Sequence, residues 1–194
     1  MAEISPGDSV AVIGAGPVGM CAMQSARLFG AGKGIALDLS QKRLDYAMAQ
    51  GLCDDVILCD DVILCGEGSV EQQIRSLTQG RGADAVIECA GNADSFQTAW
   101  QIARPNAVVA IVAMYEQPQT LPLQRMYGKN LIFKTGGVDA TQCSRLMRLI
   151  ETGKLSTGFL ISHRAPLNDI LEGYRVFEKK LDNCIKWVVT PYER

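Results

Sequence analysis

The stretch that decides the fold is Val10-Ala-Val-Ile-Gly14-Ala-Gly16-Pro-Val-Gly19-Met20. A short apolar run ends in the spacing Gly-x-Gly-x-x-Gly, and a small-residue stretch with helical character, 21–29, follows at once. Each glycine has its own task. Gly14 permits the tight turn from strand to helix, Gly16 leaves room for a pyrophosphate near the backbone, and Gly19 lets the helix pack closely on its strand.

The start of this helix favours an anion. Pro17 stands where the first helical residue is expected, and its missing N–H costs little there. The free amides and the positive end of the helix would face phosphates. The glycine spacing also occurs as a Gly-rich turn in other α/β proteins, so it does not establish a function by itself.

A carboxylate follows at the expected distance. Gly34-Ile-Ala-Leu-Asp38 predicts a second strand that ends in an acid, 19 residues past Gly19. A dinucleotide-binding fold places there the acid that accepts hydrogen bonds from the adenosine ribose hydroxyls. Because a carboxylate repels a 2′-phosphate, Asp38 favours NAD over NADP, although the nearby Lys42 and Arg43 leave NADP open. The alternative for Asp38 is a carboxylate of a turn or a helix start.

Composition excludes several classes of protein. The chain has 194 residues, 47% hydrophobic and 21% charged, with a net charge of −2, and these values are ordinary for a soluble globular protein. It has no basic run and no apolar stretch long enough to span a bilayer, so we expect neither a nucleic-acid nor a membrane partner and place the protein in the cytoplasm. The seven cysteines form no C-x-x-C pair and accompany a single histidine, which argues against a metal site and for reduced thiols.

Apolar and helical stretches alternate through the first two-thirds of the chain. Almost wholly apolar strands are typical of a parallel sheet that is covered on both faces. We therefore predict an α/β fold, a doubly wound parallel sheet (Rossmann fold) over residues 1–153, with a C-terminal helix-strand appendage over 154–194. The predicted strands are 9–13, 34–39, 83–89, 107–114 and 130–135, and the predicted helices are 17–29, 41–50, 69–78, 93–103 and 141–152.

One further strand is duplicated. Cys53-Asp-Asp-Val-Ile-Leu58 is repeated without change as residues 59–64. A slip of six residues is even, so either copy presents the same side chains to the same faces of a sheet. We expect one copy in the sheet and the other looped out, and the sequence does not choose between them.

Several segments together resemble the zinc-dependent medium-chain dehydrogenases, the alcohol dehydrogenase family. They are Ser5-Pro-Gly-Asp-Ser-Val with the glycine turn, Ile35-Ala-Leu-Asp38, Val86-Ile-Glu-Cys-Ala-Gly91, Leu160-Ile-Ser-His-Arg-Ala-Pro-Leu167, Glu172-Gly-Tyr-Arg-Val-Phe177 and Cys184-Ile-Lys-Trp-Val-Val-Thr-Pro191. The resemblance covers nearly the whole chain in the order of the family. It implies the coenzyme-binding part of an NAD-dependent alcohol or polyol dehydrogenase.

The resemblance also implies individual contacts with NAD. The backbone of Pro17 and Val18 would meet the pyrophosphate, together with the glycines. Asp38 and Arg43 would lie at the adenosine ribose. The remaining implied contacts are Cys89, Ala90 and Gly91 on the adenosine side, Met114 and Thr135 at the nicotinamide, and Lys186 at a phosphate. Glu88 is interpreted as a hydrogen-bonded structural carboxylate rather than a general base, and His163, the single histidine, as structural or solvent-facing.

The family's zinc-binding catalytic domain has no counterpart in this sequence, which contains no cysteine and histidine ligand set. We therefore expect a truncated member that binds NAD but does not turn over an alcohol alone, because zinc is expected only in the intact enzyme. We expect residues 154–194 to pack on that absent domain, and a homo-oligomer formed through the sheet edge near 130–135. Two alternatives remain: a stand-alone nucleotide-sensing regulatory module and an S-adenosylmethionine-dependent methyltransferase.

Overall fold

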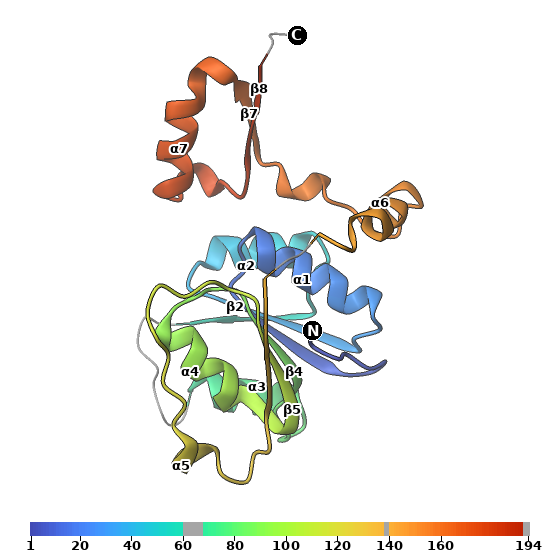
Figure 1. The fold of residues 1–194 in the computed structure, drawn as a ribbon, viewed down its shortest axis with the longest axis vertical. Coiled ribbons are helices and arrows are strands. Elements are labelled where there is room, and N and C mark those ends of the chain that lie inside the picture. Colours follow the sequence, from blue (N-terminus) through green and yellow to red (C-terminus); the bar gives the residue numbers. More distant parts are fainter. Residues whose placement is uncertain (60–67, 138–139, 192–194) are drawn as a thin grey trace. The chain divides into compact units, whose positions relative to one another are not determined.

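The computed structural model describes residues 1–59, 68–137 and 140–191 (Figure 1). The chain forms two compact units, Met1–Ala140 and Thr141–Arg194. No helix in the described ranges is long and apolar enough to cross a bilayer.

The first unit is built on one six-stranded sheet in which every pairing is parallel. The strand order is β3-β2-β1-β4-β5-β6. Strands β2 and β3 are thus added on one side of β1, and β4, β5 and β6 on its other side, so the strand order reverses between β1 and β4. This order is that of a doubly wound dinucleotide-binding sheet and confirms the predicted fold class. The strands are β1 (Ser9–Ile13), β2 (Lys33–Asp38), β3 (Asp55–Leu58), β4 (Ala83–Glu88), β5 (Ala103–Ile111) and β6 (Ile132–Thr135).

Helices cover both faces of the sheet. Figure 1 shows α1 and α2 together on one face and α3 and α4 on the other. Because both faces are covered, every residue of β1 and of β4 is buried. The helices are α1 (Pro17–Leu28), α2 (Gln41–Ala49), α3 (Val70–Leu77), α4 (Ala93–Ile102) and the short α5 (Leu123–Met126).

One hydrophobic cluster of the core lies between the sheet and α3 and α4. Ile35, Leu37, Ile74 and Val109 each expose none of their surface. A fully buried aliphatic side chain contributes roughly 1.5–3 kcal/mol relative to an exposed one. This packing fixes the strands and thereby the loops at their ends.

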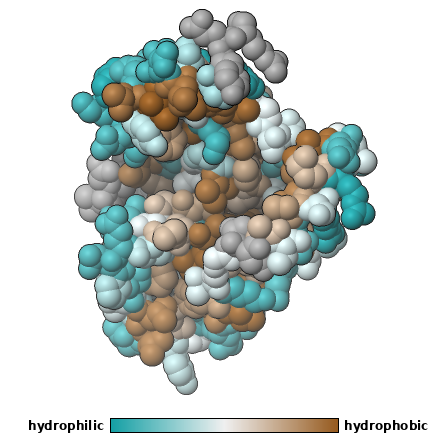
Figure 2. All heavy atoms as spheres, turned by 45° about the horizontal axis from the view of Figure 1, so that its top comes forward, coloured by the Kyte–Doolittle hydropathy of each residue, from teal (hydrophilic) through white to brown (hydrophobic). Residues whose placement is uncertain are grey.

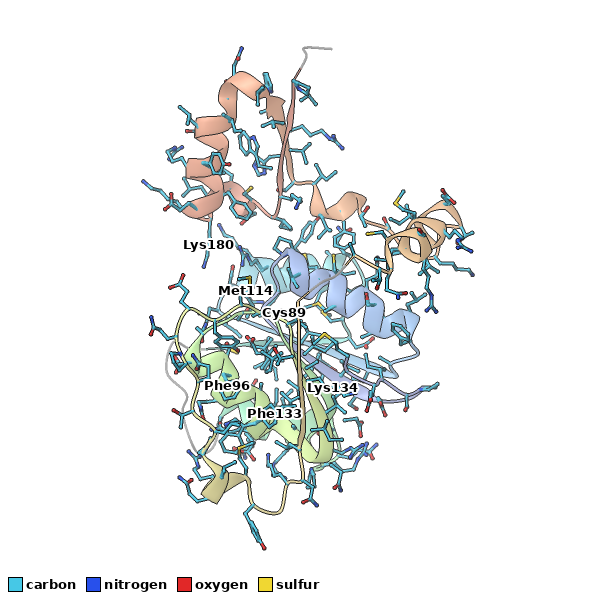
Figure 3. The ribbon with its side chains drawn as sticks, in the orientation of Figure 1. Cys89, Phe96, Met114, Phe133, Lys134 and Lys180 are labelled. Atoms are coloured by element: carbon cyan, nitrogen blue, oxygen red, sulfur yellow. The ribbon has the colours of Figure 1, made fainter. Side chains whose placement is uncertain are left out.

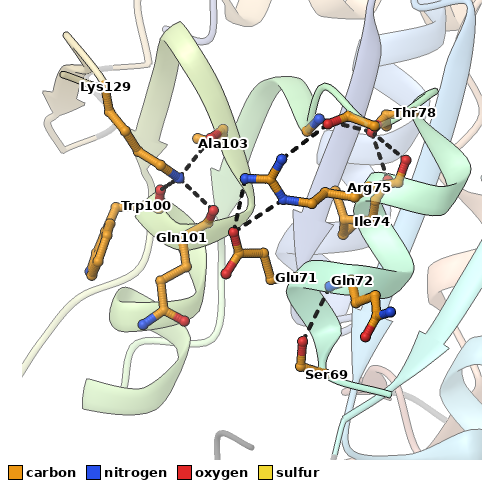
Figure 4. A network of polar contacts seen from close by, with 12 residues as sticks. Ser69, Glu71, Gln72, Ile74, Arg75, Thr78, Trp100, Gln101, Ala103 and Lys129 are labelled. Carbon is orange, nitrogen blue, oxygen red and sulfur yellow. Dashed lines mark hydrogen bonds and ion pairs between the residues drawn. The ribbon is translucent and has the colours of Figure 1, made fainter. Parts of the chain in front are cut away.

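Side chains form hydrogen bonds with the backbone at the amino end of α3 and at the carboxyl end of α4 (Figure 4). The hydroxyl of Ser69 accepts a hydrogen bond from the Gln72 amide at 3.2 Å and so caps the amino end of α3. At the end of α4, the Lys129 ammonium donates to the carbonyls of Trp100, Gln101 and Ala103 at 3.0, 2.6 and 3.0 Å. Burial lowers the pKa of Lys129; the nearby Glu71 carboxylate raises it by a smaller amount, and Arg75 adds to the lowering.

The first copy of the repeat supplies β3, while most of the second copy, residues 60–64, lies outside the described residues. Asp54 and Asp55 of the first copy both form polar contacts with neighbouring residues. The Asp54 carboxylate accepts from the Gly34 amide at 2.7 Å and from Arg27 at 2.9 Å, and Asp55 forms an ion pair with Lys33 at 3.0 Å. The prediction that one copy forms a strand is therefore confirmed for the first copy.

The second unit contains α6 (Cys143–Glu151), β7 (His163–Pro166), α7 (Ile170–Glu178) and β8 (Trp187–Thr190), with short 3-10 turns at Gly158–Leu160, Leu167–Asp169 and Leu181–Asn183. Strands β7 and β8 form a parallel pair. Trp187 packs on α7 where Gly173 has no side chain, since a Cβ there would lie 2.6 Å from the indole nitrogen. The extended segment begins at His163, because residues 158–160 form a 3-10 turn.

One face of α7 leaves apolar side chains uncovered. They include Leu171, Tyr174 and Phe177, which are 80%, 68% and 49% exposed. Figure 2 shows brown, apolar atoms gathered over this unit.

Candidate functional site

The register of the sheet brings the carboxyl ends of five strands into one row. Ile13 pairs with Leu37 on one side and with Glu88 on the other. Glu88 in turn pairs with Ile111, and Ile111 with Thr135. Ligands of open α/β sheets bind beyond the carboxyl ends, at the point where the strand order reverses. The structure therefore places the turns after β1 and β4 at this reversal.

Two glycines of the turn after β1 are required by the fold itself. Gly14 has φ +94°, and a Cβ on it would lie 3.1 Å from the Ala90 amide nitrogen. A Cβ on Gly19 would overlap the carbonyl oxygen of Gly14. A side chain is therefore strained at Gly14 and excluded by backbone at Gly19, as the sequence predicted for the tight turn and for the close helix.

Gly16 differs from both. It is the N-cap of α1, with an ordinary extended backbone at φ −82° and ψ −175°, and the nearest atom to a Cβ there would be Nη1 of Arg43 at 3.8 Å. The fold therefore does not need a glycine at this position. The space over Gly16 fits a ligand that approaches the backbone closely.

The amino end of α1 has amides available beside this space. No side chain caps the helix, and Pro17 has no N–H. The first helical bond between residues four apart is donated by Met20 to the Gly16 carbonyl at 2.9 Å. The amides of Val18 and Gly19 precede it, and such amides, together with the helix dipole, attract anions.

Asp38 and Arg43 lie at the same turn. The Asp38 carboxylate accepts hydrogen bonds from the amides of Ala15 at 2.6 Å and Ser40 at 2.8 Å, which hold it against the glycine turn. The guanidinium of Arg43 lies beside Gly16. The structure thus brings together an acidic side chain, a basic side chain and the glycine turn, which are up to 29 residues apart in the sequence.

Glu88 has the hydrogen-bonded structural role expected for it. Its side chain is fully buried. Oε1 accepts from the amides of Ala90 and Gly91 at 2.7 and 2.9 Å, and Oε2 accepts from the Tyr115 hydroxyl at 2.5 Å. Burial, and next the bond to Glu88, raises the pKa of Tyr115.

The turn 89–91 follows directly after Glu88. Burial, reinforced by the charge of Glu88, raises the pKa of the Cys89 thiol to about 12, so this cysteine is a neutral thiol at physiological pH. A Cβ on Gly91 would lie 2.7 Å from the carbonyl oxygen of Met114. Cys89 and Met114 are drawn toward the same end of the sheet in Figure 3, and the Met114 side chain is 93% exposed.

The other predicted site residues divide between the two units. Thr135 is the exposed last residue of β6, in register with Ile111 at the carboxyl edge. Lys186 belongs to the second unit, and its predicted phosphate contact stays a prediction.

The described part of the chain contains no group of three or more His, Cys, Asp or Glu side chains that could hold a metal ion. His163 stacks on Trp187 with a ring distance of 5.2 Å, and its Nδ1 lies 2.9 Å from the Ser162 hydroxyl. This is the structural role expected of the histidine. We derive no step through zinc from these residues.

Sequence reasoning missed two partners at this edge. Ala15 lies between the motif glycines, and no side chain reveals that its amide binds Asp38. Tyr115 is 27 residues beyond Glu88, and no motif connects the two. A tyrosine four residues after an apolar strand was the one available signal, and it is too common to indicate a contact.

Comparisons with known proteins show which family the chain belongs to. A family model described as zinc-binding dehydrogenase matches residues 17–152. An alcohol dehydrogenase of Cupriavidus necator is 32% identical over 98% of this chain and 51% of its own length. An NADP-dependent isopropanol dehydrogenase of Thermoanaerobacter brockii is 33% identical over 97% of this chain and 54% of its own length.

A solved structure of an alcohol dehydrogenase is also similar to this chain. The alcohol dehydrogenase TADH from Thermus sp. ATN1 superposes with a TM-score of 0.89 and 30% identity, over 98% of this chain and 53% of that one. The chain spans about half the length of the relatives it matches. None of these matches supports the alternatives of a sensing module or a methyltransferase. The chain belongs to the zinc-binding dehydrogenase family and corresponds to the nucleotide-binding part of its zinc-type alcohol dehydrogenases.

Proposed function

We propose that this chain is the NAD-binding portion of a zinc-dependent alcohol or polyol dehydrogenase. The observation that carries the proposal is the turn at Gly16. It is a glycine that packing does not require, at an uncapped helix start, with the Asp38 carboxylate held against the same turn.

The dinucleotide would be bound by groups already in place. Its pyrophosphate would rest over Gly16 and accept hydrogen bonds from the amides of Val18 and Gly19. The adenosine ribose would donate its hydroxyls to Asp38. Arg43, beside Gly16, would add a positive charge close to the phosphates or to that ribose.

The choice of NAD over NADP rests on Asp38. Family membership does not decide it, since one relative is named as NADP-dependent. A 2′-phosphate would meet the Asp38 carboxylate, whose oxygens already accept from two amides and have no proton to donate. Like charges at contact distance are repulsive by several kcal/mol at intermediate effective dielectric constants, roughly 4 kcal/mol at 4 Å and ε about 20.

In the intact enzyme the bound NAD would accept a hydride from the alcohol carbon, and the alcohol would leave as the carbonyl compound with release of a proton. The present residues contribute binding and orientation of the coenzyme. We propose that these 194 residues alone bind NAD without alcohol turnover, because the described part of the chain offers no metal donor set.

The remaining surfaces suggest partners. We propose that the exposed apolar face of α7 packs on the catalytic domain of the intact enzyme, because uncovered apolar area of this kind is unfavourable in water. β6, which pairs only with β5 in the described sheet, is the edge through which we propose that two copies associate. A cytoplasmic location is proposed from the spacing of the seven cysteines, which contains no C-x-x-C pair and is typical of reduced thiols.

The proposal is tested by titrating the purified chain with NADH, NADPH and S-adenosylmethionine while NADH fluorescence and thermal unfolding are followed. We expect NADH to bind more tightly than NADPH and S-adenosylmethionine not to bind. At about 100 times its Kd, NADH should add roughly 2.7 kcal/mol to the free energy of unfolding. Absence of NADH binding, or stabilisation by S-adenosylmethionine alone, would overturn the proposal.

A further inference from the structure

The buried carboxylate of Glu88 is the feature of the first unit that packing explains least. It ends β4 in the middle of the sheet and exposes none of its surface. No lysine, arginine or histidine of the described chain forms an ion pair with it. Burying a charge is costly, and apolar residues of similar volume are often at least as stable in such places.

Its partners are two loops at the carboxyl edge. The carboxylate holds the amides of Ala90 and Gly91 in the turn after β4, and the hydroxyl of Tyr115 in the segment after β5. The backbone carbonyl of Glu88 also accepts from the amides of Val112 and Ala113, at 2.9 and 3.1 Å. One residue therefore fixes both segments.

These two segments touch each other and the glycine turn. Gly91 is packed so closely on the segment after β5 that a Cβ would lie 2.7 Å from the Met114 carbonyl oxygen. A Cβ on Gly14 would be 3.1 Å from the Ala90 amide and 3.2 Å from its Cβ. A shift of the turn 89–91 would therefore be transmitted to Gly14, and from there to the binding surface over Gly16.

Tyr115 is itself held in place. Its ring meets Phe96 of α4 edge to face, with centroids 6.1 Å apart at 85°. Phe96 is buried and also contacts the ring of Phe133 at 6.1 Å, and both phenylalanines are labelled in Figure 3. The hydroxyl is therefore aimed at Glu88 by a rigid ring and not by a flexible side chain.

We propose that Glu88 and Tyr115 form a positioning pair, which touches no coenzyme but holds the loops after β4 and β5 in the conformation that binds it. The pair thereby determines coenzyme affinity. This inference rests on the proposed function, because it treats the carboxyl edge as the coenzyme site.

The test compares Glu88→Gln, Tyr115→Phe and the double variant with a matched control, Asp84→Asn. Asp84 is also a buried carboxylate of β4, but it stands at the opposite end of the strand, where it accepts from the Ser9 amide at 2.8 Å and from Arg104 at 2.6 Å. Tyr115→Phe removes only the hydroxyl and keeps the ring against Phe96. For each protein, the NADH Kd is measured by fluorescence titration well below its own Tm.

We expect Glu88→Gln to raise the NADH Kd by about tenfold or more, since a neutral amide oxygen replaces the carboxylate oxygen that accepts from the Ala90 and Gly91 amides. Tyr115→Phe should raise the NADH Kd by about threefold to tenfold, since it loses the hydrogen bond to Glu88. The double variant should bind within about twofold of Glu88→Gln, because the two residues act through one contact. Asp84→Asn should lower Tm but leave Kd within about twofold. Amide exchange at Ala90 and Gly91 should be faster in Tyr115→Phe than in the wild type.

Three results would overturn the inference. The first is wild-type NADH affinity in a folded Tyr115→Phe, which would leave the pair a purely structural role even if Glu88→Gln fails to fold. The second is an equal rise of Kd in Asp84→Asn, which would show a general effect of instability. The third is a wild-type chain that does not bind NADH, and this alone among them would also overturn the proposed function.

Discussion

Replacing Gly16 by serine should change the stability of the fold and the affinity for NADH in opposite directions. The backbone at Gly16 suits any residue, and a Cβ meets no atom closer than 3.8 Å. A serine N-cap is better than glycine by a few tenths of a kcal/mol, and replacing a glycine in a compatible conformation adds about 0.4–1 kcal/mol through the unfolded state. We therefore expect Gly16→Ser to gain roughly 0.5–1 kcal/mol and about 1–4 °C in Tm.

Coenzyme binding should change in the opposite direction. The serine side chain would occupy the space over the turn, and its hydroxyl would accept from the amides of Val18 or Gly19, which are the groups proposed for the pyrophosphate. We expect the NADH Kd to rise at least about tenfold, or 1.4 kcal/mol. The assays are a thermal melt and a fluorescence titration of the same samples.

The control is Gly19→Ala, whose Cβ would overlap the Gly14 carbonyl, and which should lower the free energy of unfolding by about 1–3 kcal/mol or more. A Gly16→Ser protein that is at least as stable as the wild type and binds NADH equally well would refute the reasoning, because no ligand would then use the space over Gly16.

Four further outcomes follow from particular contacts. Asp38→Ser should raise the NADH Kd about tenfold and reduce the preference over NADPH, because it removes a charged acceptor; an unchanged ratio of the two Kd values would exclude Asp38 from the choice. Lys129→Met should lower the free energy of unfolding in urea by about 1–3 kcal/mol, since three carbonyls lose their donor, without a change in NADH affinity. For Asp84, burial raises the pKa, but the Ser9 amide, Arg104 and Arg81 outweigh burial and hold the pKa below its ordinary value of 3.8. The stability that Asp84 contributes is therefore fully present above about pH 3.8 and is lost as the pH falls through the lowered pKa. Urea midpoints between about pH 5 and pH 2 should therefore fall less in Asp84→Asn than in the wild type, and parallel curves would contradict this. Deletion of residues 59–64 should retain β3, because Cys65 then follows Leu58 as Cys59 does now. The deletion shortens the connection from Leu58 to Ser69 from ten to four residues, which favours folding by about 0.8 kcal/mol through the lower entropy cost of loop closure. Loss of cooperative unfolding in the deletion variant would show that the second copy is needed.

The parts of the fold that the sequence predicted are those set by local pattern. β1, α1 and β2 were predicted within about one residue, because a continuous apolar run, a glycine turn and a proline at the helix start act over neighbouring residues. The distance from Gly19 to Asp38 predicted an acid at the end of the second strand; its carboxylate accepts from the Ala15 amide of the glycine turn, and its contact with a ribose stays a prediction.

The parts that were not predicted depend on contacts distant in sequence. β5 begins at Ala103, four residues before the predicted start at 107, because Ala103 pairs with Ala83 before a bulge that includes Asn106 at φ +62°. The partnership of Glu88 with Tyr115 depends on the packing of Phe96. The choice between the two copies of the repeat has no local signal at all, since their residues are identical.

The most direct measurement is a crystal structure of this chain with bound NADH. We predict the pyrophosphate over Gly16, within about 3.2 Å of the amides of Val18 and Gly19, and a ribose hydroxyl at the same distance from an oxygen of Asp38. Coenzyme bound elsewhere on the chain, or a carboxyl edge without it at saturating NADH, would contradict the account.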